Sequence, residues 1–138
     1  MFELRRTYRF CASHRFWRDD WSDDRNLQVF GKCALPHGHG HNYRFTLTIA
    51  GDPDPETGMT ADLAALDALV AERVEKALDH RNLNAEVPEF KTLIPTGENL
   101  AKWIFDRVAP LLPRGELVEV SLQSDEALTA TYRPHARR

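Results

Sequence analysis

The stretch His37-Gly-His-Gly-His-Asn-Tyr-Arg-Phe-Thr-Leu-Thr-Ile-Ala-Gly51 joins a run of histidines to a pattern of alternating apolar and polar residues. From Asn42 to Gly51 the odd positions are apolar and most even positions are polar. This period of two is typical of a half-buried β-strand. Extended backward, the same parity places His39 and His41 on the core-facing side. The stretch therefore predicts a strand that carries two imidazoles on its apolar face.

A second alternating segment lies at the N-terminus, from Phe2 to His14. Its even positions are apolar except for Arg6, and His14 projects from the apolar face at the far end. If the two strands pair, His14 converges with His39 and His41. Three neutral imidazoles that meet at one point form a site for a borderline metal such as zinc.

Other groups near the histidines allow more than one interpretation. His37 precedes the regular strand, so it is a metal ligand, a hydrogen-bond partner of a ligand, or an ordinary loop histidine. Cys33 is either a small buried side chain or, near a metal, a nucleophile or base. Asp79 and His80, at the end of a predicted helix, form either a helix cap or a carboxylate and imidazole pair for proton transfer.

The remaining chain indicates an α+β fold. Asp62 is a suitable cap for a helix that ends near Asp79 and His80, and Thr96 or Gly97 begins a second helix. Two further strands are expected, roughly at residues 117–123 and 128–133, whereas residues 16–36 and 81–95 read as irregular. We therefore predict a four-stranded antiparallel sheet with both helices on one face, in the order ββααββ. The open edges of such a sheet favour association with other copies.

Length and charge narrow the range of functions. The 138 residues suit a single domain, and the net charge of −3 provides no basic surface for nucleic acid or an anionic membrane. The most apolar run, residues 63–71, is interrupted by Asp67 and is too short to span a bilayer. The two cysteines form no CxxC motif, so we expect a protein of the reducing cytoplasm with a small-molecule partner.

Six motifs together resemble the 6-pyruvoyltetrahydropterin synthase family, and they cover nearly the whole chain. They are Phe10-x-Ala-Ser-His14, Phe30-Gly-Lys-Cys33, Gly38-His-Gly-His-Asn-Tyr43, Asp54-Pro-x-Thr-Gly-Met59, Leu78-Asp-His-Arg-Asn-Leu83 and Thr96-Gly-Glu-Asn99. The resemblance implies the tunnelling fold (T-fold), in which trimers of the ββααββ unit close a barrel and two trimers stack into a hexamer.

The resemblance also implies roles for individual residues. A zinc ion would be held by His14, His39 and His41, and Cys33 would be the general base. Asp79 and His80 would form a proton relay supplied by a neighbouring subunit. The implied reaction eliminates triphosphate from 7,8-dihydroneopterin triphosphate and gives 6-pyruvoyltetrahydropterin, with Zn²⁺ as the cofactor.

The residues implied in pterin binding are Thr96, Glu98 and Gln123, and Gln123 departs from the family pattern. Family members usually anchor the amidine edge of the ring on a Glu followed by Thr, whereas this chain reads Leu122-Gln-Ser-Asp125. A neutral amide matches that edge less well than a carboxylate does. Two alternatives therefore stay open, the related 6-carboxytetrahydropterin synthase of deazapurine biosynthesis and a family member that binds a heterocycle without turnover.

Overall fold

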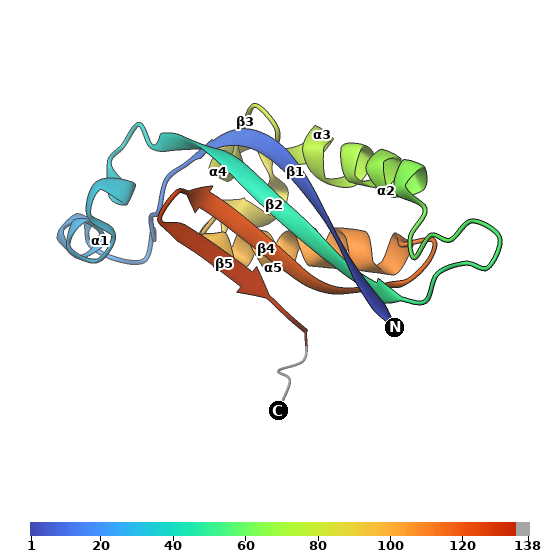
Figure 1. Cartoon of the computed structure of the whole chain (residues 1–138). Helices are drawn as coiled ribbons and strands as arrows, with labels where there is room; N and C mark the ends of the chain where they lie inside the picture. Colours follow the sequence, from blue (N-terminus) through green and yellow to red (C-terminus); the bar gives the residue numbers. More distant parts are fainter. Residues whose placement is uncertain (135–138) are drawn as a thin grey trace.

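A computed structural model describes residues 1–134 and contains one five-stranded sheet with the order β3-β1-β2-β4-β5 (Figure 1). The strands are β1 (Phe2–His14), β2 (His39–Gly51), β3 (Arg81–Asn82), β4 (Glu116–Asp125) and β5 (Leu128–Tyr132). β1 with β2, β2 with β4, and β4 with β5 pair antiparallel, whereas β3 runs parallel to β1. An α+β fold is thereby confirmed.

β1 and β2 pair along their whole length, from Phe2 opposite Gly51 to His14 opposite His39. The predicted parity is confirmed, because Phe10 and Tyr43 are buried on the same face and their rings stack with centroids 4.6 Å apart. Apolar side chains on this face form the centre of the core together with the helices. The largest fully buried side chains include Phe45, Leu47, Ile49, Leu66, Leu78, Phe90, Leu100, Ile104 and Leu122.

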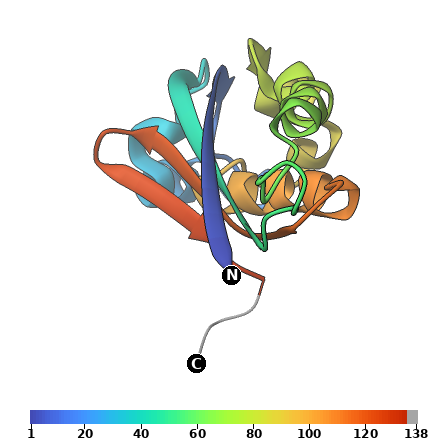
Figure 2. The ribbon, with the colours of Figure 1, turned by 45° about the vertical axis from the view of Figure 1, so that its right-hand side comes forward.

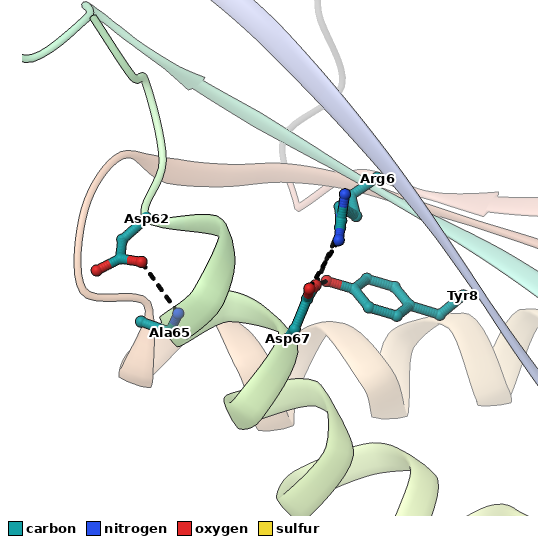
Figure 3. Close-up of polar contacts among 5 residues, drawn as sticks. All are labelled: Arg6, Tyr8, Asp62, Ala65 and Asp67. Atoms are coloured by element: carbon teal, nitrogen blue, oxygen red, sulfur yellow. Dashed lines mark hydrogen bonds and ion pairs between the residues drawn. The ribbon is translucent and has the colours of Figure 1, made fainter. Parts of the chain in front are cut away.

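The helices that cover the sheet lie on one of its faces, as Figure 2 shows. The first is a continuous helical segment made of α2 (Leu63–Val70), a π-helical turn, η2 (Ala71–Glu75), and α3 (Lys76–Leu78). The second is α5 (Gly97–Val108), followed by the short 3-10 helix η4 (Ala109–Leu111). The predicted caps are present, because the Asp62 side chain accepts the Ala65 N–H (Figure 3) and the Thr96 hydroxyl accepts the Asn99 N–H.

The structure corrects the prediction of four strands and two helices in the order ββααββ. The interval 16–36 contains α1 (Asp23–Phe30) and the 3-10 helix η1 (Gly31–Ala34). The interval 81–95 contains β3, α4 (Leu83–Glu86) and the 3-10 helix η3 (Pro88–Lys91). These elements have four or fewer residues except α1, and the buried residue of α1 is the polar Asn26, so hydrophobic periodicity gave no signal.

α1 lies at the end of the sheet where β1 finishes and β2 begins (Figure 1). Its Ser22 cap accepts the Arg25 N–H, and the Asn26 amide bonds to the backbone of Arg18 and Ser22. The segment between the two long strands is therefore folded next to the predicted metal ligands.

Among residues 1–134, no helix has the length and apolar character needed to cross a membrane.

Candidate metal centre

The three histidines predicted to bind metal meet at one end of the β1–β2 pair. His14 ends β1 directly opposite His39, and His41 lies opposite Ala12. The Nε2 atom of His39 is 3.2 Å from Nε2 of His14 and 3.0 Å from Nε2 of His41. Donor atoms of all three side chains lie within 4.8 Å of one another. Nitrogen atoms that converge in this way suit one metal ion with room for a further ligand.

The other ring nitrogen of His14 is held by the protein. Nδ1 lies 3.1 Å from the Pro95 carbonyl oxygen and 3.1 Å from the Tyr43 hydroxyl. The carbonyl can only accept, so His14 donates its Nδ1–H to Pro95 and keeps the Nε2 lone pair for a metal. Burial, and after it the charges of His39 and His41, lowers the pKa of His14 to about 4. The ring is therefore neutral near pH 7, as a metal ligand must be.

The glycines between the histidines allow the two strand ends to approach closely. Gly38 has a φ of +64°, and a Cβ there would lie 2.5 Å from the His14 carbonyl oxygen. A Cβ on Gly40 would lie 3.2 Å from the Ala12 carbonyl oxygen. Glycine is thus needed at position 38, and at position 40 it relieves a tight contact where β2 lies against the end of β1.

Cys33 lies in η1 beside the histidine cluster and is only partly exposed. Its carbonyl oxygen accepts the Phe16 N–H at 2.8 Å, which fixes η1 against the chain that leaves His14. The pKa of Tyr43 is raised by burial and secondarily by the Cys33 thiol. The Tyr43 hydroxyl, in turn, lies 3.1 Å from Nδ1 of His14. His37 is exposed and lies outside the group of three donors.

Asp79 and His80 lie elsewhere, at the end of α3 beside Cys11. Asp79 Oδ1 accepts the Cys11 N–H at 2.9 Å, and the His80 N–H donates to the Cys11 carbonyl at 2.7 Å. The His80 Nδ1 atom is 3.0 Å from Asp79 Oδ1, so the adjacent side chains do pair. His80 is exposed and has a φ of 60°, a conformation that is costly for a residue with a side chain.

Residues 3–135 match the family described as 6-pyruvoyl tetrahydropterin synthase. This chain belongs to that family. Among curated relatives, the 6-pyruvoyl tetrahydrobiopterin synthase of Homo sapiens is 40% identical over 131 residues, which cover 95% of this chain and 90% of the human protein. The enzyme of the same name from Dictyostelium discoideum is 36% identical over 124 residues, which cover 90% of each chain.

One solved structure agrees with membership of the 6-pyruvoyl tetrahydropterin synthase family, and a second shows the same fold. The Caenorhabditis elegans 6-pyruvoyl tetrahydropterin synthase has a TM-score of 0.92 and 34% identity, and the alignment covers 97% of this chain and 96% of that one. An uncharacterized protein from Wolinella succinogenes, with a TM-score of 0.72 and 16% identity, shares the fold.

The residues that the family resemblance implies in pterin binding do not all lie together in this chain. Thr96 is the N-cap of α5 and follows Pro95, whose carbonyl contacts His14. Glu98 is exposed in the first turn of α5. Gln123 lies on β4 next to the buried Leu122, so its side chain is on the sheet face away from the helices. It pairs with Arg44 across the ladder.

Sequence reasoning assigned no role to Tyr43 or Pro95, although both contact the metal centre. Tyr43 lies two residues beyond His41 on the same face, so its parity was a usable signal. The Pro95 contact is made by a backbone carbonyl across 81 positions of sequence. A carbonyl has no residue-type signature, so this contact could be found only in three dimensions.

Proposed function

We propose that this chain is a zinc-dependent lyase that eliminates triphosphate from 7,8-dihydroneopterin triphosphate to give 6-pyruvoyltetrahydropterin. The main support is the convergence of His14, His39 and His41, with Nε2 atoms 3.0 and 3.2 Å apart, in a member of the synthase family. The free thiols of Cys11 and Cys33 suit a reducing compartment, so we place the activity in the cytoplasm.

The donor set fits zinc. Zn²⁺ accepts three imidazole nitrogens and leaves a position for another ligand. The His14 ring is buried, and its Nδ1–H is directed to Pro95, which leaves Nε2 for the metal. Bound there, zinc would supply electrostatic stabilisation for negative charge that develops on the side-chain oxygens of the substrate.

Cys33 is the base in this proposal. Its thiolate removes the proton from C1′ of the substrate side chain, and the electron pair moves into the ring, which gains protons at N5 and C6. The C1′ hydroxyl also loses its proton, so C1′ becomes a ketone while the ring is reduced by two electrons. Loss of a second proton from C2′ expels triphosphate by cleavage of the C3′–O bond. The resulting enol gains a proton at C3′ and becomes the second ketone, so no external oxidant is needed.

Asp79 and His80 act as the relay from a neighbouring subunit. Within one chain they contact Cys11, and His80 is highly exposed at the β3 edge of the sheet. A second open edge is β5. Unpaired strand edges favour association, which supports the barrel-forming trimers and the stacked hexamer of the T-fold. In such an assembly one subunit would bring His80 toward the Cys33 of another.

The pterin ring would be bound by Thr96, Glu98 and Gln123. Thr96 lies next to Pro95 at the metal centre, whereas Gln123 is on the other face of the sheet. Gln123 would therefore reach a ring bound between subunits. A small-molecule pterin substrate also fits the net charge of −3, which does not favour polyanionic partners.

The test is to incubate the zinc-loaded protein with 7,8-dihydroneopterin triphosphate and to follow triphosphate and product together. Release of triphosphate with formation of 6-pyruvoyltetrahydropterin supports the proposal. No turnover by protein that holds one zinc per chain would refute it. Acetaldehyde among the products would instead assign the 6-carboxytetrahydropterin synthase reaction.

A further inference from the structure

Cys11, Asp79 and His80 form a second cluster of metal-binding side chains, separate from the histidine centre. One donor atom from each, a sulfur, an oxygen and a nitrogen, lies within 4.8 Å of the other two. The three residues come from the last part of β1 and from the turn after α3, so they meet only in the folded chain. Thiolate, imidazole and carboxylate are the side chains that bind zinc in proteins.

The backbone holds this cluster in place. Asp79 and His80 bracket the Cys11 peptide, since Asp79 accepts its N–H at 2.9 Å and the His80 N–H donates to its carbonyl at 2.7 Å. His80 adopts its left-handed conformation, φ 60°, at this point. Strain of this kind in a residue other than glycine persists where the surrounding contacts enforce it. The three side chains are thus positioned before any ligand arrives.

The electrostatic surroundings suit a cation. The N–H of Cys11, and secondarily His80, lowers the pKa of Asp79, which keeps it a carboxylate. Glu75 is a second acidic residue one helical turn before Asp79, and its carbonyl accepts the Asp79 N–H at 2.8 Å. The neighbouring Arg81 guanidinium is 3.3 Å from the Glu86 carboxylate, and this pairing offsets its positive charge.

The cluster also opens to solvent. Cys11 and His80 line a surface cavity of about 380 Å³, which extends to His41 and Asn42 on β2. A metal ion can enter from this side without passing through the core. The cavity lies on the face of β1 and β2 that carries Cys11 and Asn42, opposite to the face that carries the three histidines, so an ion held there would be separate from the histidine centre.

We infer that Cys11, Asp79 and His80 form a second, inhibitory zinc site. A zinc ion there would coordinate the imidazole and carboxylate that the proposed function uses to move protons. The occupied site would therefore lower turnover while the histidine centre keeps its own metal. The inhibitory effect rests on the proposed function, whereas the binding itself does not.

Cobalt(II) tests the binding without any turnover. The metal-free protein is titrated with Co²⁺ beyond one equivalent, and near-ultraviolet sulfur-to-cobalt charge-transfer absorption is recorded. We expect this absorption in the unmodified protein and in Cys33→Ser, and its loss in Cys11→Ser. Serine keeps the backbone contacts of Cys11, and Cys33→Ser is the matched control because it removes the thiol beside the histidines. Absence of the band in the unmodified protein, or its persistence in Cys11→Ser, would overturn the inference.

Excess zinc tests the inhibition. The zinc concentration that halves turnover should rise by about 10-fold or more in Cys11→Ser, because loss of a direct ligand costs at least as much affinity as loss of an outer partner. Turnover of each protein is expressed relative to its own value without added zinc, so a change in basal activity does not affect the comparison. Equal sensitivity of the two proteins to zinc would refute the inhibitory role. If the protein shows no turnover at all, the proposed function is refuted. The cobalt titration alone then determines whether Cys11, Asp79 and His80 bind a metal.

Discussion

The Arg6 guanidinium on β1 and the Asp67 carboxylate on α2 form a two-bonded ion pair that joins the sheet to the helix layer (Figure 3). Nε of Arg6 is 3.0 Å from Oδ1 of Asp67, and the second contact is 2.7 Å. The Tyr8 hydroxyl donates to the same carboxylate at 2.6 Å. Arg6 interrupts the apolar alternation of β1, and Asp67 interrupts the apolar run of α2. The two interruptions are explained together, because the two side chains bind each other.

This pair predicts a pH dependence of stability. Hydrogen bonds from Arg6, and then from Tyr8, lower the pKa of Asp67 below its ordinary value of 3.8. The carboxylate therefore stabilises the fold above that value, and the stabilisation is lost as the pH falls through the lowered pKa. Asp67→Asn should reduce the unfolding free energy at pH 7, and its difference from the unmodified protein should shrink toward pH 2.

Urea unfolding at several pH values measures this difference. Asp19→Asn is the control, because Asp19 is an exposed carboxylate away from the Arg6 pair. If the difference in unfolding free energy between Asp67→Asn and the unmodified protein stays constant from pH 7 to pH 2, the charge of Asp67 does not stabilise the fold as stated.

Removal of the Tyr43 hydroxyl should weaken metal binding. The hydroxyl lies 3.1 Å from Nδ1 of His14, and partners of this kind typically contribute about 10-fold or more to metal affinity. Tyr43→Phe keeps the ring that stacks on Phe10, so the fold is expected to persist. Competition with a chromogenic chelator gives the zinc dissociation constant. Tyr132→Phe is the control, and equal affinities of the two variants would show that the Tyr43 contact has no effect.

Cys33→Ala should lower kcat by about 100- to 10,000-fold, the range expected for loss of a proton-transfer base. Zinc content should remain near one per chain, because Cys33 is not among the three converging histidine donors. Single-turnover kinetics and metal analysis of the same sample provide both values. A variant with unchanged kcat would identify a different base.

Mixed oligomers test whether the relay acts between subunits. If Cys33 and His80 of one site come from different chains, random mixing of Cys33→Ala with His80→Ala should restore about a quarter of the sites. Each variant refolded alone under the same conditions is the control. Mixtures no more active than the separate variants would place both groups in a single chain.

Gln123→Glu should improve recognition of the pterin ring. A carboxylate accepts two hydrogen bonds from an amidine edge, and a charged bond of this kind should lower KM by about 10-fold. Gln28→Glu on the exposed face of α1 is the control for added charge. If KM for 7,8-dihydroneopterin triphosphate is unchanged, the ring edge meets another side chain, for which Glu98 is the first candidate.

The strands and the histidine cluster were predictable because their signals are local and periodic. Parity alone placed His14, His39 and His41 on one face, and the pairing of His14 with His39 brought them together. The helix caps Asp62 and Thr96 were also predictable from the sequence. In each case the side chain accepts a hydrogen bond from the backbone N–H three residues further along the chain.

The features that sequence reasoning missed depend on contacts between distant segments. β3 is only two residues long and exists because Arg81 and Asn82 pair with the outer side of β1. α1 has no apolar stripe directed to the core, and it is held by its Ser22 cap, by the stacking of Phe30 on Trp21 and by the hydrogen bonds of Asn26. Cys11 and His80 likewise lie close together because β1 meets the end of α3, and their spacing in the sequence does not predict this contact.

The positions of His14 and His39 have a topological consequence for the segment between them. This segment carries α1 and Cys33, and it leaves β1 immediately after one ligand and enters β2 immediately before the other. A metal held by both histidines would close it into a ring of polypeptide with the base inside. Without the metal, only the β1–β2 ladder would hold the two ends of this segment together, so a protease that cleaves within residues 15–38 should act faster on the metal-free protein.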